Sequence, residues 1–187
     1  MQKRTRIMGG VGLILTLSGM IPKMTLASLI GMILLLVAYN WLSKEYQERK
    51  VFSKALAAFL IPFLGSIALA IVLGIFIAIL IIKSVFSIEI FNQLESGNFS
   101  YLYNYLWFFG VLFLCWIVVS ILMIISGTKW KEADYIIAEK SGEGLFRTAG
   151  DLIYIGSLLF FILIGSLVIL VGIIIKIIAF FSVKETE

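Results

Sequence analysis

Long apolar runs separated by short charged segments constrain this chain more than any other feature. They cover residues 7–22, 25–42, 55–82, 101–126 and 151–183. A helix needs about 20 apolar residues to cross a hydrocarbon core of about 30 Å. Only 14% of the residues are charged, against about 25% in a typical soluble domain. The sequence therefore predicts an all-α, polytopic transmembrane helical bundle that forms a single domain over residues 1–187.

The last apolar run is too long for one crossing. Its 33 residues would extend about 50 Å as one straight helix. Gly165 and Ser166 lie near its middle, so we expect two short spans, 151–165 and 166–183, joined by a turn. This interpretation gives six spans in total. A single crossing of the run, which gives five spans, is the alternative.

The basic residues predict an orientation. With six spans and a cytoplasmic N-terminus, Lys23 and Lys83 lie outside, Lys176 lies within a span, and the other 12 of the 15 Lys and Arg residues lie inside, as the positive-inside rule requires. These inner residues are Lys3, Arg4, Arg6, Lys44, Arg49, Lys50, Lys54, Lys129, Lys131, Lys140, Arg147 and Lys184. The C-terminus is then also inside, and Asn98 begins a glycosylation sequon in an outer loop. We expect a multi-pass protein of the cell membrane.

Residues 127–150 form a polar segment between two apolar runs. In TKWKEADYIIAEK, one predicted helical face is apolar and the other carries Lys131, Glu132, Asp134 and Lys140, which is typical of a helix at a membrane interface. The following SGEG, residues 141–144, contains two glycines that favour a helix stop. We therefore expect a cytoplasmic amphipathic hinge that continues the fourth span and then breaks.

Two sets of residues are candidates for specific contacts within the membrane. Lys176 is the charge inside a predicted span, where a lysine is costly unless it snorkels or pairs, and we expect a structural ion pair with Asp151 in the same hairpin. The second set is a helix-packing face of small residues, which favour close helix approach, either inside the bundle or between two copies of the chain. Its members recur every four residues: Ser66, Ala70, Gly74 and Ala78.

The residue inventory limits the chemistry. The chain has no histidine and one cysteine, Cys115, so the commonest general base and cysteine-based metal motifs are missing. Gly142 and Gly144 lack the Lys-Ser/Thr that completes a phosphate-binding loop. We expect no catalytic, cofactor-binding or metal-binding residue, no cofactor and no enzymatic activity.

Several segments together resemble a known family. These are LSKEY, VFSKAL at 51–56, AEKSGEGLFRTAG at 138–150 and AFFSVK at 179–184. With them the chain resembles the archaeal integral membrane proteins grouped as domain of unknown function 996, over nearly its whole length. The resemblance implies a multi-spanning protein of an archaeal cell membrane, and it implies no assigned activity or catalytic residues.

The function expected from the sequence is that of a non-enzymatic scaffold or of an interaction or assembly subunit. The alternative is a small transporter or channel for an ion or small solute, because residues 6–42 and 147–183 share ten identical positions without gaps and repeated hairpins occur in transporters. The expected partners are the lipid bilayer and either a second copy of the chain or another membrane protein. Nucleic acid is not expected, because the basic residues are spread over short loops.

Overall fold

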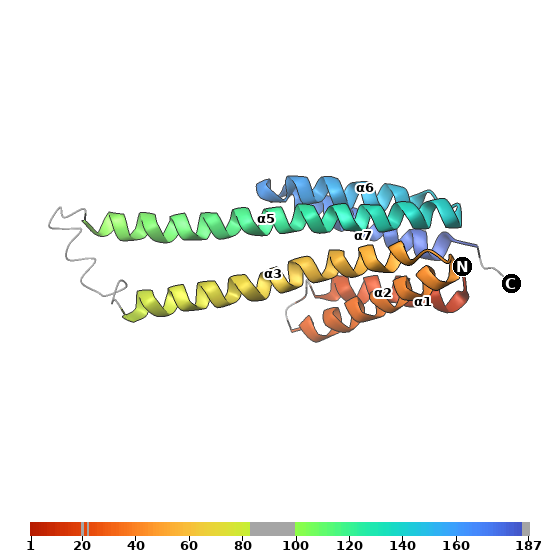
Figure 1. Ribbon diagram of the computed structural model, residues 1–187, viewed down its shortest axis with the longest axis horizontal. Coiled ribbons are helices and arrows are strands. Elements are labelled where there is room, and N and C mark those ends of the chain that lie inside the picture. Colours follow the sequence, from red (N-terminus) through yellow and green to blue (C-terminus); the bar gives the residue numbers. More distant parts are fainter. Residues whose placement is uncertain (20, 22, 83–99, 185–187) are drawn as a thin grey trace.

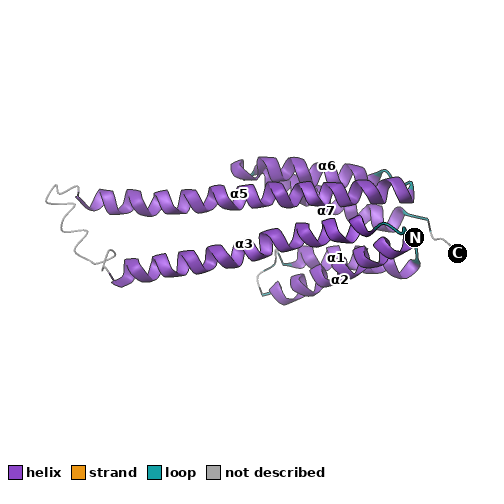
Figure 2. Ribbon diagram, in the orientation of Figure 1, coloured by secondary structure: helices purple, strands orange, loops and turns teal. Residues whose placement is uncertain are grey.

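The computed structural model describes residues 1–19, 21, 23–82 and 100–184, and every regular element in these ranges is helical (Figure 2). The all-α prediction is confirmed. Five of the helices are long and apolar enough to cross a membrane; α1, with 16 residues, is shorter. The elements are α1 (Lys3–Ser18), α2 (Thr25–Glu45), α3 (Arg49–Ile82), α5 (Ser100–Ser141), α6 (Leu145–Leu158), the 3₁₀ helix η1 (Leu159–Ile162) and α7 (Ile164–Ser182).

The two longest helices, α3 and α5, pack against each other as an antiparallel pair (Figure 1). The hairpin α1–α2 packs on α3, the hairpin α6–α7 packs on α5, and α1 contacts α7. Both hairpins are shorter than the central pair, so α3 and α5 extend well beyond them at one end (Figure 1). Asn98 lies outside the described residues.

The two ends of the described chain meet at the other end of the bundle. The amino group of Met1 donates a hydrogen bond to the carbonyl of Lys184 at 3.4 Å. The guanidinium of Arg6 donates to the carbonyl of Val183 at 3.3 Å. The chain therefore begins and ends at one end of the bundle, as the hairpin interpretation of the last apolar run requires.

The last run folds back on itself as two helices, α6 and α7, but the turn lies before the expected one. The chain reverses at Leu163, which has a left-handed φ of 63°, and Gly165 and Ser166 already belong to α7. The segment 127–150 also differs in detail from a separate hinge. Its first part is the uninterrupted end of α5, and the helix break is confined to residues 142–144, where Gly142 has a φ of 72°. Because the chain restarts its helix at once, α6 begins at Leu145 rather than at 151.

The buried core lies at the end of the bundle where the chain ends meet. It combines residues from all six described α-helices, and its large members include Tyr39, Phe146 and Phe180, each fully buried. The far halves of α3 and α5 contribute little to it. No residue in the most apolar part of α3 is buried within the chain, which is the expected surface of a helix that faces lipid.

In each of the hairpins α1–α2 and α6–α7, the two helices approach closely at a glycine of the second helix. A Cβ on Gly31 of α2 would lie 2.6 Å from the carbonyl oxygen of Gly12 on α1. A Cβ on Gly172 of α7 would lie 3.1 Å from the backbone nitrogen of Ile153 on α6. The ungapped comparison of the sequence places Gly31 over Gly172 and Gly12 over Ile153. The two hairpins therefore cross at equivalent positions, which supports the internal repeat.

Candidate functional site

Three polar side chains from three helices meet in the core. Tyr39 lies on the buried face of α2 with Leu35 and Leu42, because positions three and four apart share one side of a helix. Asp134 of α5 shares its buried face in the same way with Ile137. Lys176 of α7 is 1% exposed. We call Tyr39, Asp134 and Lys176 the buried triad.

The carboxylate of Asp134 is the centre of the triad. The ammonium nitrogen of Lys176 lies 2.6 Å from its Oδ2, and the hydroxyl of Tyr39 donates a hydrogen bond of 2.5 Å to its Oδ1. Asp134 is fully buried. A buried charge of either sign is tolerated when it is paired and hydrogen-bonded, whereas removing one partner leaves an uncompensated charge. Each helix of the triad therefore depends on the other two.

Aromatic rings complete the surroundings of the Lys176 ammonium. Its nitrogen lies 4.4 Å from the ring centre of Trp130 and 5.8 Å from that of Tyr39, which is within the range of cation–π attraction. The ring of Tyr39 packs edge-on against Trp130 at 5.2 Å and against Phe180 at 6.2 Å. Phe146, from the polar segment 138–150, packs edge-on against Phe180 at 5.1 Å. That segment thus anchors α6 to the aromatic shell.

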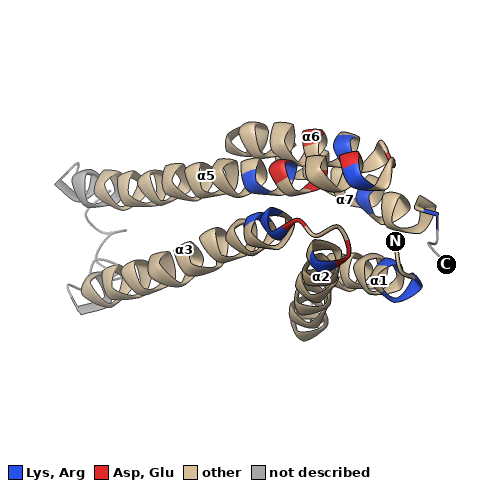
Figure 3. Ribbon diagram, turned by 45° about the vertical axis from the view of Figure 1, so that its right-hand side comes forward, with Lys and Arg blue, Asp and Glu red and all other residues tan. Residues whose placement is uncertain are grey.

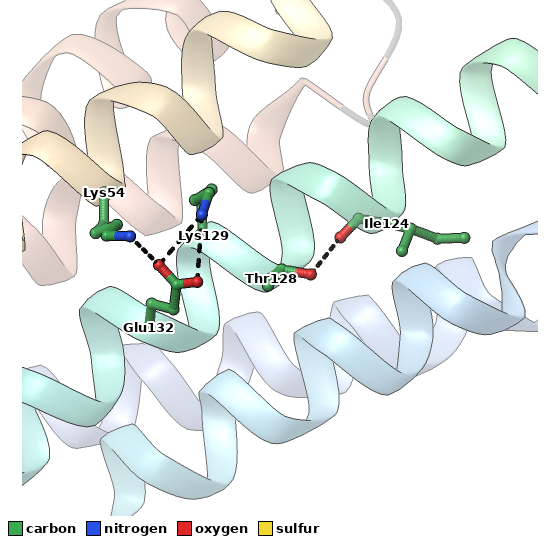
Figure 4. A network of polar contacts seen from close by, with 5 residues as sticks. All are labelled: Lys54, Ile124, Thr128, Lys129 and Glu132. Carbon is green, nitrogen blue, oxygen red and sulfur yellow. Dashed lines mark hydrogen bonds and ion pairs between the residues drawn. The ribbon is translucent and has the colours of Figure 1, made fainter.

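A second set of ion pairs surrounds the triad at partly exposed positions. Lys54 of α3 pairs with Glu132 of α5, and Lys129 approaches the same carboxylate at 3.2 Å (Figure 4). Lys131 of α5 pairs with Asp151 of α6 at 2.8 Å. These side chains are roughly one third exposed, so each contact contributes little to stability. They place charged groups of α3, α5 and α6 in one layer, which is visible at one end of the bundle (Figure 3).

A cavity of about 310 Å³ lies next to the triad. All six described α-helices contribute to its wall, which is mainly apolar, and Lys176 forms part of it. Three hydroxyl groups also line the cavity, and each donates to a backbone carbonyl: Thr16 to Gly12 at 2.8 Å, Ser126 to Ala58 at 2.6 Å and Ser157 to Ile153 at 2.7 Å. The wall of the cavity is therefore apolar except at these hydroxyl groups and at Lys176, whose charge is neutralised by Asp134.

Comparison with known proteins places the chain in a family. The model of a family described as a protein of unknown function, DUF996, matches residues 27–174. The chain belongs to the DUF996 family. The predicted resemblance is confirmed, and the matched segment contains Tyr39 and Asp134.

One similar relative of this DUF996 protein comes from an archaeon. The uncharacterized protein MJ1644 of Methanocaldococcus jannaschii is 27% identical over 184 residues, which cover 98% of this chain and 93% of the relative. No solved structure matches the chain. The comparisons thus show an unknown-function family, and the site has to be interpreted from its own geometry.

The predicted ion pair between Asp151 and Lys176 is wrong. Asp151 faces α5, where it pairs with Lys131 and accepts a hydrogen bond of 2.6 Å from the Tyr135 hydroxyl. Lys176 faces the centre of the bundle and pairs with Asp134. The two residues lie on different sides of their hairpin, because α6 turns its Asp151 side to the outer layer of charges. Lys176 also does not snorkel, since its side chain is 2% exposed.

Asp134 is the site residue that the sequence interpretation placed on the wrong face. It was expected on the polar face of an interfacial helix, yet it is fully buried. Spacing gave a signal for this position, because Asp134 lies four residues after Trp130 and three before Ile137, in the same stripe. Of the described residues, none forms a group of three or more potential metal ligands.

The predicted packing face on α3 does not pack inside the bundle. Ser66, Ala70, Gly74 and Ala78 are all exposed in the chain, and nothing lies within 4 Å of a Cβ built on Gly74. The reason is the register of α3, which turns other residues toward α5: a Cβ on Gly65 would lie 2.3 Å from the side chain of Leu122. A contact between two copies of the chain at this face stays a prediction.

Proposed function

We propose that this DUF996 protein is a non-enzymatic membrane component that binds a small apolar or amphipathic molecule in its central cavity. The observation that supports this proposal is the cavity of about 310 Å³ at the meeting point of all six described α-helices. Binding sites for small molecules typically begin at about 300 Å³, and they are mostly apolar with a few converging polar groups. The wall of this cavity has that composition.

The chemistry around Lys176 limits the class of ligand. Lys176 already neutralises Asp134 at 2.6 Å, so an anion would have to compete with a buried carboxylate. The Thr16, Ser126 and Ser157 hydroxyl protons are engaged by backbone carbonyls. A neutral molecule with an apolar body therefore fits best, with any polar group directed toward Lys176.

The scaffold or assembly role expected from the sequence is part of the same proposal. The buried triad fixes α2, α5 and α7 relative to one another, which gives a rigid frame around the cavity. The uncovered apolar part of α3 offers a surface on which another membrane protein could pack. Binding in the frame and contact with a partner are compatible, because they use different faces of the bundle.

Transport of a small solute or ion is the second candidate. It is favoured by Lys176 in the cavity wall and by the equivalent glycine crossings of the two hairpins. A polar path through a bundle usually needs several uncommitted polar groups that converge on one cavity. Those in this wall are engaged with the backbone or with each other, so binding is the better-supported proposal.

Quenching of Trp130 fluorescence tests the binding proposal. Trp130 lines the cavity, and 1-bromohexane is a small apolar quencher that acts on contact. The signal of Trp130 is the difference between the wild type and Trp130→Phe in the same nanodiscs, which removes the contribution of the other three tryptophans. We expect saturable quenching of this difference signal.

Two leucine substitutions control this experiment. Ala58 lines the cavity and Ala57 does not, so Ala58→Leu should reduce the quenching of Trp130 at least about threefold while Ala57→Leu leaves it unchanged. Quenching that does not saturate, or that is equal in the two variants, would contradict the proposal. Ion flux in proteoliposomes under a K⁺ diffusion potential, abolished by Ala58→Leu, would favour transport instead.

A further inference from the structure

The turn between α6 and α7 carries only apolar side chains and one serine. Its sequence, LFFILIGS at 159–166, contains no charged residue. Ile162, Leu163 and Ile164 are 62%, 65% and 60% exposed. Leu163 adopts the left-handed region, which usually favours glycine or asparagine. The exposed apolar side chain of Leu163 is unfavourable for a loop in water and favourable for a loop in hydrocarbon, whereas its backbone strain is the same in both.

Several polar backbone groups of this turn have hydrogen-bond partners within the protein. The N–H of Leu163 donates to the carbonyl of Phe160 at 3.0 Å, and the N–H of Ser166 donates to the carbonyl of Leu163 at 3.2 Å. The Ser166 hydroxyl donates to the Leu163 carbonyl at 2.7 Å. The indole N–H of Trp116 on α5 donates to the carbonyl of Phe161 at 3.3 Å. Such internal pairing is what non-helical backbone needs inside a bilayer, where water is absent.

The hairpin is also short when it is measured from the layer of charges. Asp151 pairs with Lys131, and only 12 residues, 152–163, separate it from the turn, which correspond to about 18 Å of helix. From Lys54 in the same layer, α3 continues through residues 55–82, about 42 Å. A hydrocarbon core is about 30 Å thick. With the charges at the inner headgroups, α3 crosses the core and the α6–α7 turn stops about 10 Å short of its far side.

We propose that α6–α7 is a re-entrant hairpin, whose turn lies inside the hydrocarbon core and contacts lipid acyl chains. Both helices enter and leave at the inner side, so the hairpin does not open to the outer solution. The full lengths of the two helices, 18 residues for Leu145–Ile162 and 19 for Ile164–Ser182, are those of a membrane span. Part of each length, however, lies at the end of the bundle that carries the charged layer, outside the hydrocarbon core. Lipid is the occupant because the exposed turn has no charged group and its described carbonyl groups at Phe160, Phe161 and Leu163 already have donors.

Single cysteines in a Cys115→Ser chain test the depth of the turn. Ile162→Cys and Leu163→Cys are made in the full chain, reconstituted in phosphatidylcholine and phosphatidylglycerol vesicles, and either treated with a charged maleimide or spin-labelled. Gln47→Cys, exposed near the charged end, is the accessible control for that side. Asn98→Cys marks the side that the charge pattern predicts to be outside.

We expect both turn cysteines to react at least about tenfold more slowly than Gln47→Cys and Asn98→Cys, from either side of the vesicle. Their spin labels should collide often with oxygen and rarely with a water-soluble nickel chelate. Reaction from the Asn98 side would show a complete crossing and overturn the proposal. Poor access to both oxygen and nickel would show that protein, such as a second copy of the chain, covers the turn, and it would overturn the assignment to lipid. Ile162→Cys keeps the left-handed position unchanged, so a folding defect of Leu163→Cys does not remove the test.

Discussion

Replacing Lys176 by methionine should be among the most damaging single changes to this fold. Methionine keeps the apolar length of the side chain but leaves the Asp134 carboxylate without the ammonium group that lies 2.6 Å away. Breaking a buried ion pair from one side typically costs 3–5 kcal/mol, roughly. The only relief is protonation of the carboxyl group, which at pH 7 costs about 4 kcal/mol, since each pH unit above an ordinary value of about 3.9 costs about 1.36 kcal/mol. The two estimates agree.

This cost should depend on pH with a definite sign. In Lys176→Met the folded state holds a proton on Asp134 that the unfolded state releases above about pH 4. The folded state then binds more protons, so its stability falls as the pH rises and recovers as the pH is lowered toward 4. The difference in stability between Lys176→Met and the wild type should therefore narrow as the pH is lowered from 7 to 5.

The free energy of unfolding is measured in mixed micelles with increasing SDS, at pH 7 and pH 5. Lys131→Met is the matched control, because Lys131 pairs with Asp151 at 2.8 Å but is about 30% exposed; we expect a loss of less than about 1 kcal/mol. Adding Asp134→Asn to Lys176→Met removes both charges and should restore at least about 2 kcal/mol. A loss in Lys176→Met no larger than that of the control would refute the reasoning.

Three other substitutions test separate contacts by the same unfolding assay. Tyr39→Phe removes the hydroxyl that donates to Asp134 at 2.5 Å and should cost about 1.5–3 kcal/mol, the range for hydrogen bonds to charged groups; an unchanged stability would show that the bond is not formed. Gly31→Ala places a Cβ 2.6 Å from a backbone oxygen of α1 and should cost about 1–3 kcal/mol of stability. Gly74→Ala, with nothing within 4 Å of its Cβ, should be neutral or stabilising. Equal effects of the two substitutions would contradict the close approach of α1 and α2. Gly142→Ala strains a residue with a φ of 72° and should cost about 1 kcal/mol, and no loss would show that the helix break does not need this conformation.

The helices of this protein could be predicted because their signal is local. Runs of apolar residues longer than a membrane is thick allow few other folds, and Gly165 and Ser166 near the middle of the 33-residue run predicted a reversal there. The break after Ser141 could be placed because glycine is the residue that adopts the required backbone conformation. The turn of the last hairpin was placed at Gly165 for the same reason, but the chain uses Leu163. Local preference was overridden there by the packing of α6 on α7, in which the backbones of Gly156 and Gly165 approach closely.

The candidate site could not be predicted because its signal is not local. Asp134 and Lys176 are 42 positions apart, and each alone is expected at a polar surface, where its charge is hydrated. Burial becomes favourable only when both lie in one place, and that depends on how α7 returns along α5. Charge alone suggested Asp151, the nearest carboxylate in the same hairpin, as the partner of Lys176. The actual partner of Lys176 is Asp134, which lies on the buried face of α5.

The measurement that tests this account most directly is the distance between Asp134 and Lys176 in a lipid bilayer. The chain contains two aspartates, Asp134 and Asp151. The Lys131→Met variant removes the lysine that pairs with Asp151. In this variant, solid-state NMR dipolar recoupling between ¹³Cγ-labelled aspartate and ¹⁵Nζ-labelled lysine reports the distance within the Asp134–Lys176 pair. We predict a distance of about 4 Å or less between these two atoms, consistent with the 2.6 Å contact between Nζ and Oδ2. The coupling should disappear when Lys176→Met is added. Absence of coupling in the Lys131→Met protein, or coupling that persists without Lys176, would contradict a core built on this ion pair.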